Sequence, residues 1–176
     1  MNHVVQALLS ALFLAAQAWG GPPAFLSDGP WRSGRVYSVY DPHYGRATPE
    51  VKRNTNGHDN PLRIGGSTFT KGFGAWRFSV IEIDVPNDAR GIAGLVGIDA
   101  EEGGRGGDTI FSIRVDGQDR WQSPALGRDD PAVAFSLPLA GATTVELLTD
   151  AQGYGNGDLA DWCDVRWLVV TPKQPT

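Results

Sequence analysis

The sequence predicts an all-β fold, an antiparallel β-sandwich, on three observations. Several short segments alternate apolar and polar residues with the period of two that is typical of strands. The 23 glycines and 12 prolines are spread along the 176 residues, as expected where many strands are joined by turns. No segment combines a sustained 3.6-residue periodicity with helix caps. At least seven short strands at this spacing favour a sandwich or a barrel.

The first residues form a separate unit. Residues 4–16 are almost all apolar but too few to span a bilayer, and Ala16-Gln17-Ala18 matches the small-x-small pattern after which signal peptidase cleaves. We therefore expect a signal peptide at 1–18, cleavage near Ala18 and a secreted protein, extracellular or periplasmic. A linker at 19–30, one domain at 31–170 and a frayed tail at 171–176 would follow.

Each expected strand has its own apolar pattern. From residue 78 onward, Ser79, Ile81 and Ile83 share one face, and the next alternating segment ends at Asp116-Gly117, a strong hairpin signal. The expected strands lie at residues 35–40, 62–64, 67–69, 78–85, 92–99, 109–115, 133–137, 145–147 and 165–169.

Charge and cysteine content narrow the choice of partners. The net charge of -5 argues against nucleic acid, whose phosphates require a basic surface, and against anionic membranes. No second apolar stretch approaches the length of a membrane span. Cys163 is the single cysteine, which excludes an internal disulfide and suits a small buried hydrophobic residue. Neutral partners such as sugars fit this composition best.

Four segments, in order, resemble one family. They are Pro61–Gly66 with Phe69–Gly74, then Gly94–Asp99, Thr109–Gly117 and Asp158–Asp164. Together they are similar to the NPCBM domain, a carbohydrate-binding module found beside glycoside hydrolase catalytic domains. The resemblance covers about residues 30–170. It implies a jelly-roll-like sandwich related to discoidin and malectin-type modules, a galactose-type glycan ligand and, in some members, a structural Ca²⁺. No other cofactor is expected.

The sequence departs from that pattern at two positions. Trp76 and Leu159 stand where the family commonly has histidine. Both replacements remove polar groups that could bear on a sugar site. They leave open an alternative function, a secreted β-sandwich that has lost sugar binding and docks onto another secreted protein.

A sugar site needs an aromatic platform together with planar hydrogen-bonding side chains. Trp76 and Arg77 supply that pairing, and Glu101 lies on a later loop. Asp158 and Asp161 are three residues apart, a spacing that predicts neighbouring carboxylates on a helical turn, able to accept sugar hydroxyls or to bind Ca²⁺. Structural alternatives remain for each: a core position for Trp76, a solvated loop tip for Glu101, and caps of backbone amides for the two aspartates.

The sequence does not favour catalysis. The adjacent pairs Glu101-Glu102 and Asp129-Asp130 point to opposite sides of an extended chain, which does not suit a glycosidase. Hydrolase, metalloprotease and phosphate-loop signatures are absent from the sequence. His43 and His58 could in principle hold a transition metal, but two histidines in a polar loop are interpreted as solvated residues. We therefore expect a non-catalytic module.

Overall fold

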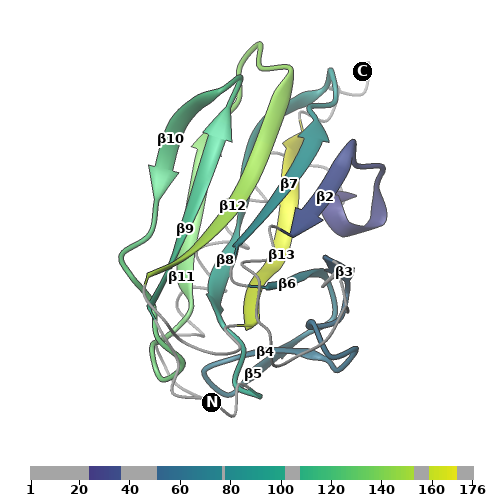
Figure 1. Ribbon diagram of the computed structural model, residues 1–176. Helices are drawn as coiled ribbons and strands as arrows, with labels where there is room; N and C mark the ends of the chain where they lie inside the picture. Colours follow the sequence, from purple (N-terminus) through teal and green to yellow (C-terminus); the bar gives the residue numbers. More distant parts are fainter. Residues whose placement is uncertain (1–23, 37–50, 77, 102–107, 153–158, 170–176) are drawn as a thin grey trace, which may run out of the picture.

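The computed structural model describes residues 24–36, 51–76, 78–101, 108–152 and 159–169. Two antiparallel sheets pack face to face as a β-sandwich, which confirms the predicted fold class (Figure 1). The six-stranded sheet has the order β11-β8-β13-β6-β3, with β1 pairing β13. The five-stranded sheet has the order β10-β9-β12-β7-β2, and β4 and β5 form a separate hairpin.

The strands match most of the predicted segments. Within the described ranges they are β1 (Ala24–Phe25), β2 (Ser33–Val36), β3 (Lys52–Arg53), β4 (Leu62–Ile64), β5 (Ser67–Phe69), β6 (Gly72–Trp76), β7 (Phe78–Asp84), β8 (Ala89–Ile98), β9 (Asp108–Val115), β10 (Gln118–Gln122), β11 (Val133–Pro138), β12 (Thr144–Gln152) and β13 (Leu159–Val169). A single 3₁₀ turn, η1 (Leu26–Asp28), is described between β1 and β2.

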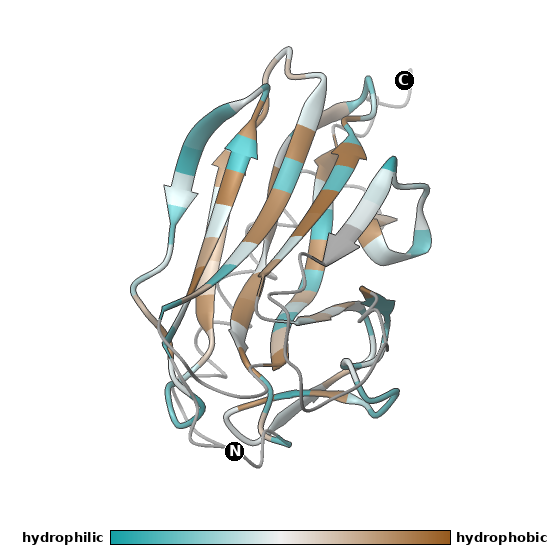
Figure 2. Ribbon diagram, viewed as in Figure 1, coloured by the Kyte–Doolittle hydropathy of each residue, from teal (hydrophilic) through white to brown (hydrophobic). Residues whose placement is uncertain are grey.

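The main core lies between the two sheets. On the five-stranded sheet, every second side chain of β7, β9 and β12 is buried, including Ile81, Ile113 and Leu147, and the bands of alternating hydropathy are visible along these strands in Figure 2. Phe111 packs edge-on against Trp162 of the opposite sheet, with ring centroids 5.3 Å apart. The period-two pattern of the sequence therefore identified the inward face correctly.

A second, smaller core lies on the other side of the six-stranded sheet. The β4–β5 hairpin places Leu62, Ile64 and Phe69 against Leu95 of β8 and Cys163 of β13. These two strands are consequently buried on both faces, and neither shows the alternating burial of a strand with one exposed face. Cys163 is a small buried residue, as predicted, and burial raises the pKa of its thiol.

The hairpin turn between β9 and β10 is the one the sequence predicted. Asp116 and Gly117 have φ of 47° and 77°, as a two-residue turn with the twist of a β-hairpin requires. The Asp116 carboxylate accepts hydrogen bonds from the backbone and hydroxyl groups of Thr143 and Thr144 at 2.8–3.2 Å. These bonds stabilise the charged form and lower the pKa of Asp116 to about 2.

The N-terminal boundary differs from the prediction. The sequence predicts a linker at 19–30, yet in its described part β1 pairs with β13 and Leu26 is buried in the main core. Burial of this apolar side chain makes the segment part of the folded domain. The segment is too short to show a strand pattern in the sequence. The expected signal peptide (1–18) and tail (171–176) lie outside the described residues. Within the described part of the chain, no helix is long and apolar enough to cross a membrane.

Candidate functional site

The loop at residues 54–60 is organised by one buried amide. The side chain of Asn56 has no exposed surface, and its Oδ1 accepts hydrogen bonds from the backbone N–H of His58 (2.9 Å) and of Asn60 (3.0 Å). The loop lies directly on β6, because a Cβ at Gly74 would fall 2.4 Å from the Cα of Asn56. The loop is therefore held in one conformation against the sandwich.

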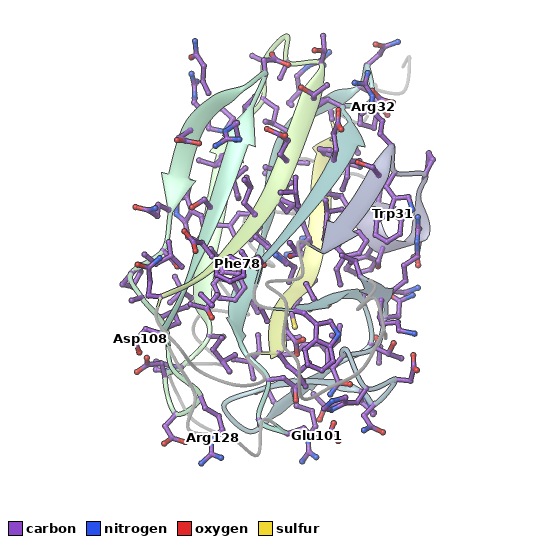
Figure 3. The ribbon with its side chains drawn as sticks, in the orientation of Figure 1. Trp31, Arg32, Phe78, Glu101, Asp108 and Arg128 are labelled. Atoms are coloured by element: carbon purple, nitrogen blue, oxygen red, sulfur yellow. The ribbon has the colours of Figure 1, made fainter. Side chains whose placement is uncertain are left out.

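Glu101 is attached to that loop by two hydrogen bonds. Its Oε2 accepts from Nδ2 of Asn56 at 2.7 Å and its Oε1 accepts from Nδ2 of Asn60 at 2.6 Å. These two amides are the largest causes that lower the pKa of Glu101, and His58 and Arg63 add favourable charge. Glu101 is exposed, at the end of the molecule that also bears Asp108 and Arg128 and opposite the end that bears Arg32 (Figure 3). It is an oriented, ionised hydrogen-bond acceptor that faces solvent.

Trp76 contacts the same loop. Its indole is half-buried, and the exposed imidazole of His58 meets it edge-on with ring centroids 5.2 Å apart. Backbone packs on the indole too: a Cβ added at Gly57 would lie 2.8 Å from the Nε1 of Trp76 and 2.6 Å from Cδ2 of Leu159. Trp76 is therefore a partly exposed aromatic group next to the loop, and not a sealed core residue.

The two departures from the family pattern are neighbours in the fold. Trp76 of β6 pairs in register with Leu159 of β13, and both contact the backbone at Gly57. Leu159 is fully buried, so this replacement serves packing beneath the loop. Trp76 and Leu159 therefore lie side by side on β6 and β13, at two positions where the family resemblance implies histidine.

The remaining predicted site residues behave differently. Arg77 and Asp158 lie outside the described residues. Asp161 lies in strand β13 and not on the helical turn inferred from its spacing, and its side chain has no exposed surface. The three-residue spacing misled because a central strand covered on both faces shows no alternation. Asp161 therefore contacts the protein interior, beneath the residues that face solvent.

The expected structural Ca²⁺ finds no matching ligand set among the described residues. No group of three histidine, cysteine, aspartate or glutamate side chains comes together there to hold a metal ion. Ca²⁺ requires six to eight oxygen ligands, most often with several carboxylates. The carboxylates that the structure describes do not by themselves form such a set.

The arrangement can provide both parts of sugar recognition. The exposed parts of Trp76 and His58 offer an aromatic surface for the C–H face of a pyranose ring. The carboxylate of Glu101 can accept hydroxyl hydrogens, and the amide of Asn60 adds a polar group beside it. Sequence reasoning selected Trp76 and Glu101 but treated His58 as a solvated loop residue and did not select Asn56 or Asn60. An Asn-Gly dipeptide before His58 was the available signal of a defined turn.

Comparison with protein families gives one match that covers most of the chain. The model of the NPCBM/NEW2 domain matches residues 24–167. The chain belongs to the NPCBM/NEW2 domain family. The match begins at the first residue of β1, in agreement with the position of this strand in the sandwich. It confirms the resemblance carried by the four sequence segments.

Curated relatives of this NPCBM/NEW2 domain are much longer proteins. An α-1,3-galactosidase B from Akkermansia muciniphila is 30% identical over 131 residues, which is 72% of this chain and 16% of that protein. A protein from Renibacterium salmoninarum that carries the name of an endo-α-N-acetylgalactosaminidase is 32% identical over 120 residues, 68% of this chain and 8% of that protein. The chain thus corresponds to a small part of each relative.

Solved structures share the fold. The CBM51 of a Clostridium perfringens GH95 protein in complex with methyl-galactose superposes with a TM-score of 0.72 at 20% identity, covering 83% of this chain and 99% of that one. The second CBM51 of Clostridium perfringens ZmpB, in complex with GlcNAc, gives 0.71 at 23% identity, covering 83% of this chain and 31% of that one. At these identities the comparison establishes the β-sandwich fold alone.

Proposed function

We propose that this NPCBM/NEW2 domain binds a neutral glycan through a galactose-type or N-acetylglucosamine-type sugar. The observation that carries the proposal is the loop at residues 54–60, which contacts both the exposed carboxylate of Glu101 and the half-buried indole of Trp76. Carboxylate and indole supply the polar and the apolar part of a sugar contact from one rigid support.

The similar modules support the choice of sugar. The two CBM51 structures are complexes with methyl-galactose and with GlcNAc. Both curated relatives carry the names of enzymes that act on galactose-type or N-acetylgalactosamine-type linkages. Galactose and N-acetylglucosamine are neutral, and the net charge of -5 does not oppose their binding.

The proposed role is binding without bond cleavage. A glycosidase needs a general acid whose pKa is raised so that it keeps a proton, together with a second carboxylate at a defined separation. The pKa of Glu101 is lowered instead, which keeps this group ionised as an acceptor. Such a module would deliver an attached or associated hydrolase to its glycan.

Secretion is part of the same proposal. The apolar run at residues 4–16 followed by Ala16-Gln17-Ala18 would direct the chain out of the cell, where polymeric glycans are found. Arg77 and Asp158 remain candidate sugar contacts next to Trp76 and Leu159 in the sequence.

An interaction protein without sugar affinity is the second candidate function. The half-buried Trp76 favours it, because this residue brings an apolar side chain to the surface where the family resemblance implies a histidine. In that case the surface around Trp76 would bind another secreted protein.

Isothermal titration calorimetry with methyl-galactose, GlcNAc and glucose separates the two. For a shallow, solvated site we expect a Kd on the order of 10⁻⁴–10⁻³ M for one of the first two sugars. Trp76→Ala and Glu101→Gln should each weaken binding about tenfold or more, because one removes the platform and the other the charge. Asp84→Asn, an exposed carboxylate paired with Arg32 at the opposite end of the molecule (Figure 3), is the matched control and should leave binding unchanged. Absence of heat with all three sugars at millimolar concentration would favour the interaction protein.

A further inference from the structure

Two carboxyl groups lie fully buried directly behind Glu101. Asp99 follows the last residue of β8, and Asp161 lies on the neighbouring strand β13, opposite Gly97. Neither side chain has any exposed surface. Two ionised carboxylates this deeply buried would repel each other strongly, because the protein interior screens charge poorly. The pair therefore needs a cation or a proton.

The hydrogen bonds of the two groups are unequal. Oδ1 of Asp99 accepts from the backbone N–H of Glu101 at 2.7 Å, and its Oδ2 accepts from the backbone N–H of Arg63 at 3.0 Å. Asp161 shares the second donor, since its Oδ2 lies 3.2 Å from the nitrogen of Arg63. Its other oxygen, Oδ1, has no hydrogen-bond partner. Asp99 thus uses both oxygens as acceptors, and Asp161 retains a buried oxygen that lacks a donor.

No cation is available to neutralise the pair among the described residues. The charged and titratable groups around it are the exposed side chain of Arg63 on β4, Glu101 and the imidazole of His58 above it, and Cys163 and Asp164 farther along β13. Burial, followed by the hydrogen bond to Asp99 and the charge of Asp99, raises the pKa of Asp161 well above its ordinary value. No third metal-binding side chain joins the pair within the described ranges.

We infer that Asp161 is protonated in the native protein and donates this proton to Asp99, whose carboxyl group accepts from the backbone N–H of Glu101 and fixes it. The unequal hydrogen bonds favour a proton on Asp161. A protonated Asp99 would present a donor to one of the two N–H groups that it accepts from, whereas a proton on Oδ1 of Asp161 opposes no hydrogen bond among the described residues. Asp99 is accordingly a positioning residue for Glu101, a role that rests on the proposed glycan site. The proton on Asp161 removes one of the two buried negative charges, so that Asp99 can position Glu101 from the protein interior.

The inference predicts a specific pH dependence. The unfolded chain releases the proton of Asp161 near pH 3.8, whereas the native protein retains it up to the raised pKa. Between these two values the native state binds one more proton than the unfolded state, so stability falls as pH rises. Asp161→Asn places an amide N–H₂ where the protonated oxygen lies and removes this dependence. The unfolding constant of the wild type should therefore rise about tenfold per pH unit relative to the variant above pH 3.8.

The experiment compares wild type, Asp161→Asn and Asp99→Asn by urea unfolding from pH 4 to 9, by infrared spectroscopy and by titration with methyl-galactose. We expect a pH-dependent stability gain in Asp161→Asn, loss of an infrared band of a protonated carboxyl in the same variant, and unchanged sugar affinity. Asp99→Asn should be destabilised and, where folded, should bind sugar at least about tenfold more weakly, because it loses the bond to the Glu101 backbone.

A stability difference between wild type and Asp161→Asn that is constant with pH, or a carboxyl band that persists in this variant, would overturn the proton assignment. Equal loss of sugar affinity in both variants would overturn the positioning role of Asp99. The unfolding and infrared measurements use no sugar and do not require Asp99→Asn to fold. If the wild type bound no sugar, the proposed function would fail while these two measurements still decided where the proton lies.

Discussion

Gly57→Ala tests whether the loop and the indole form one unit. The added Cβ would lie 2.6 Å from Cδ2 of Leu159 and 2.8 Å from Nε1 of Trp76, whereas ordinary contacts begin at 3.4 Å. The difference between 3.4 and 2.6 Å requires a movement of about 0.8 Å. Leu159 is fully buried and Trp76 is paired across the sheet, so we expect the loop to move.

The energetic consequence follows from two opposing terms. Forcing an extra methyl group into a packed contact costs about 1–3 kcal/mol. Replacing glycine by alanine where φ is not left-handed returns about 0.4–1 kcal/mol, because the unfolded chain loses freedom. From the midpoints of these two ranges we expect Gly57→Ala to lower the free energy of unfolding by about 1.3 kcal/mol.

Sugar affinity should fall as well. A shift of that size would lengthen the bond from Asn56 to Glu101, now 2.7 Å, to about 3.5 Å, the outer limit of a hydrogen bond. An unpinned Glu101 should cost about tenfold in Kd, or about 1.4 kcal/mol. Urea unfolding and calorimetric titration with methyl-galactose measure the two effects. Gly127→Ala is the control, because its added Cβ would meet atoms only at 3.7 Å. Wild-type stability and affinity in Gly57→Ala would refute the reasoning.

Three further results are expected. Asp116→Ala should be less stable than wild type at pH 6, and the difference should close between pH 3.8 and about 2, because the hydrogen bonds from Thr143 stabilise only the ionised form; urea unfolding across this range measures it. Phe111→Ala should lower the free energy of unfolding by about 3–5 kcal/mol, since it opens a cavity beside Trp162. Chemical denaturation measures this loss, and a loss below about 1 kcal/mol would contradict the prediction. Sugar affinity should be constant above pH 4.5 and should fall only at lower pH, where Glu101 takes up a proton, and a titration series from pH 3 to 7 would show it.

The fold was largely predictable because one face of the five-stranded sheet is exposed to solvent, which makes apolar and polar residues alternate along its strands. Ser79, Ile81 and Ile83 recur at every second position of β7, because every second residue faces the core. Asp116-Gly117 marks a hairpin turn, because this turn requires positive φ at both residues and aspartate and glycine are among the residues that adopt it easily. The same local logic fails for β13. Its residues 159–163 are all buried because the β4–β5 hairpin covers the second face, so Asp161 carried no sign of its strand position.

The candidate site was predictable only in part because its contacts connect distant segments. Trp76 and Glu101 could be selected by residue type, whereas Asn56 reveals its role only through a bond to a side chain 45 residues away. His58 likewise gains an aromatic partner from a strand that follows its loop. Residue type indicates what a side chain can do, but a polar loop of ordinary composition does not indicate which sheet it will cover.

The second core explains how a polar site can be held rigidly at the end of a sandwich. Burial of Leu62 and Ile64 fixes β4 on the outer face of the six-stranded sheet, and between these two residues the backbone of Arg63 is left to form polar contacts. Its N–H donates to Asp99 and Asp161, and its C=O accepts from Ala100 at 2.7 Å. The apolar contacts therefore stabilise the hairpin, and the hydrogen bonds of the Arg63 peptide groups hold Asp99 and Ala100, and with them Glu101, in place. A change that loosens the hairpin, although it touches no exposed residue, should thus weaken glycan binding before it unfolds the sandwich.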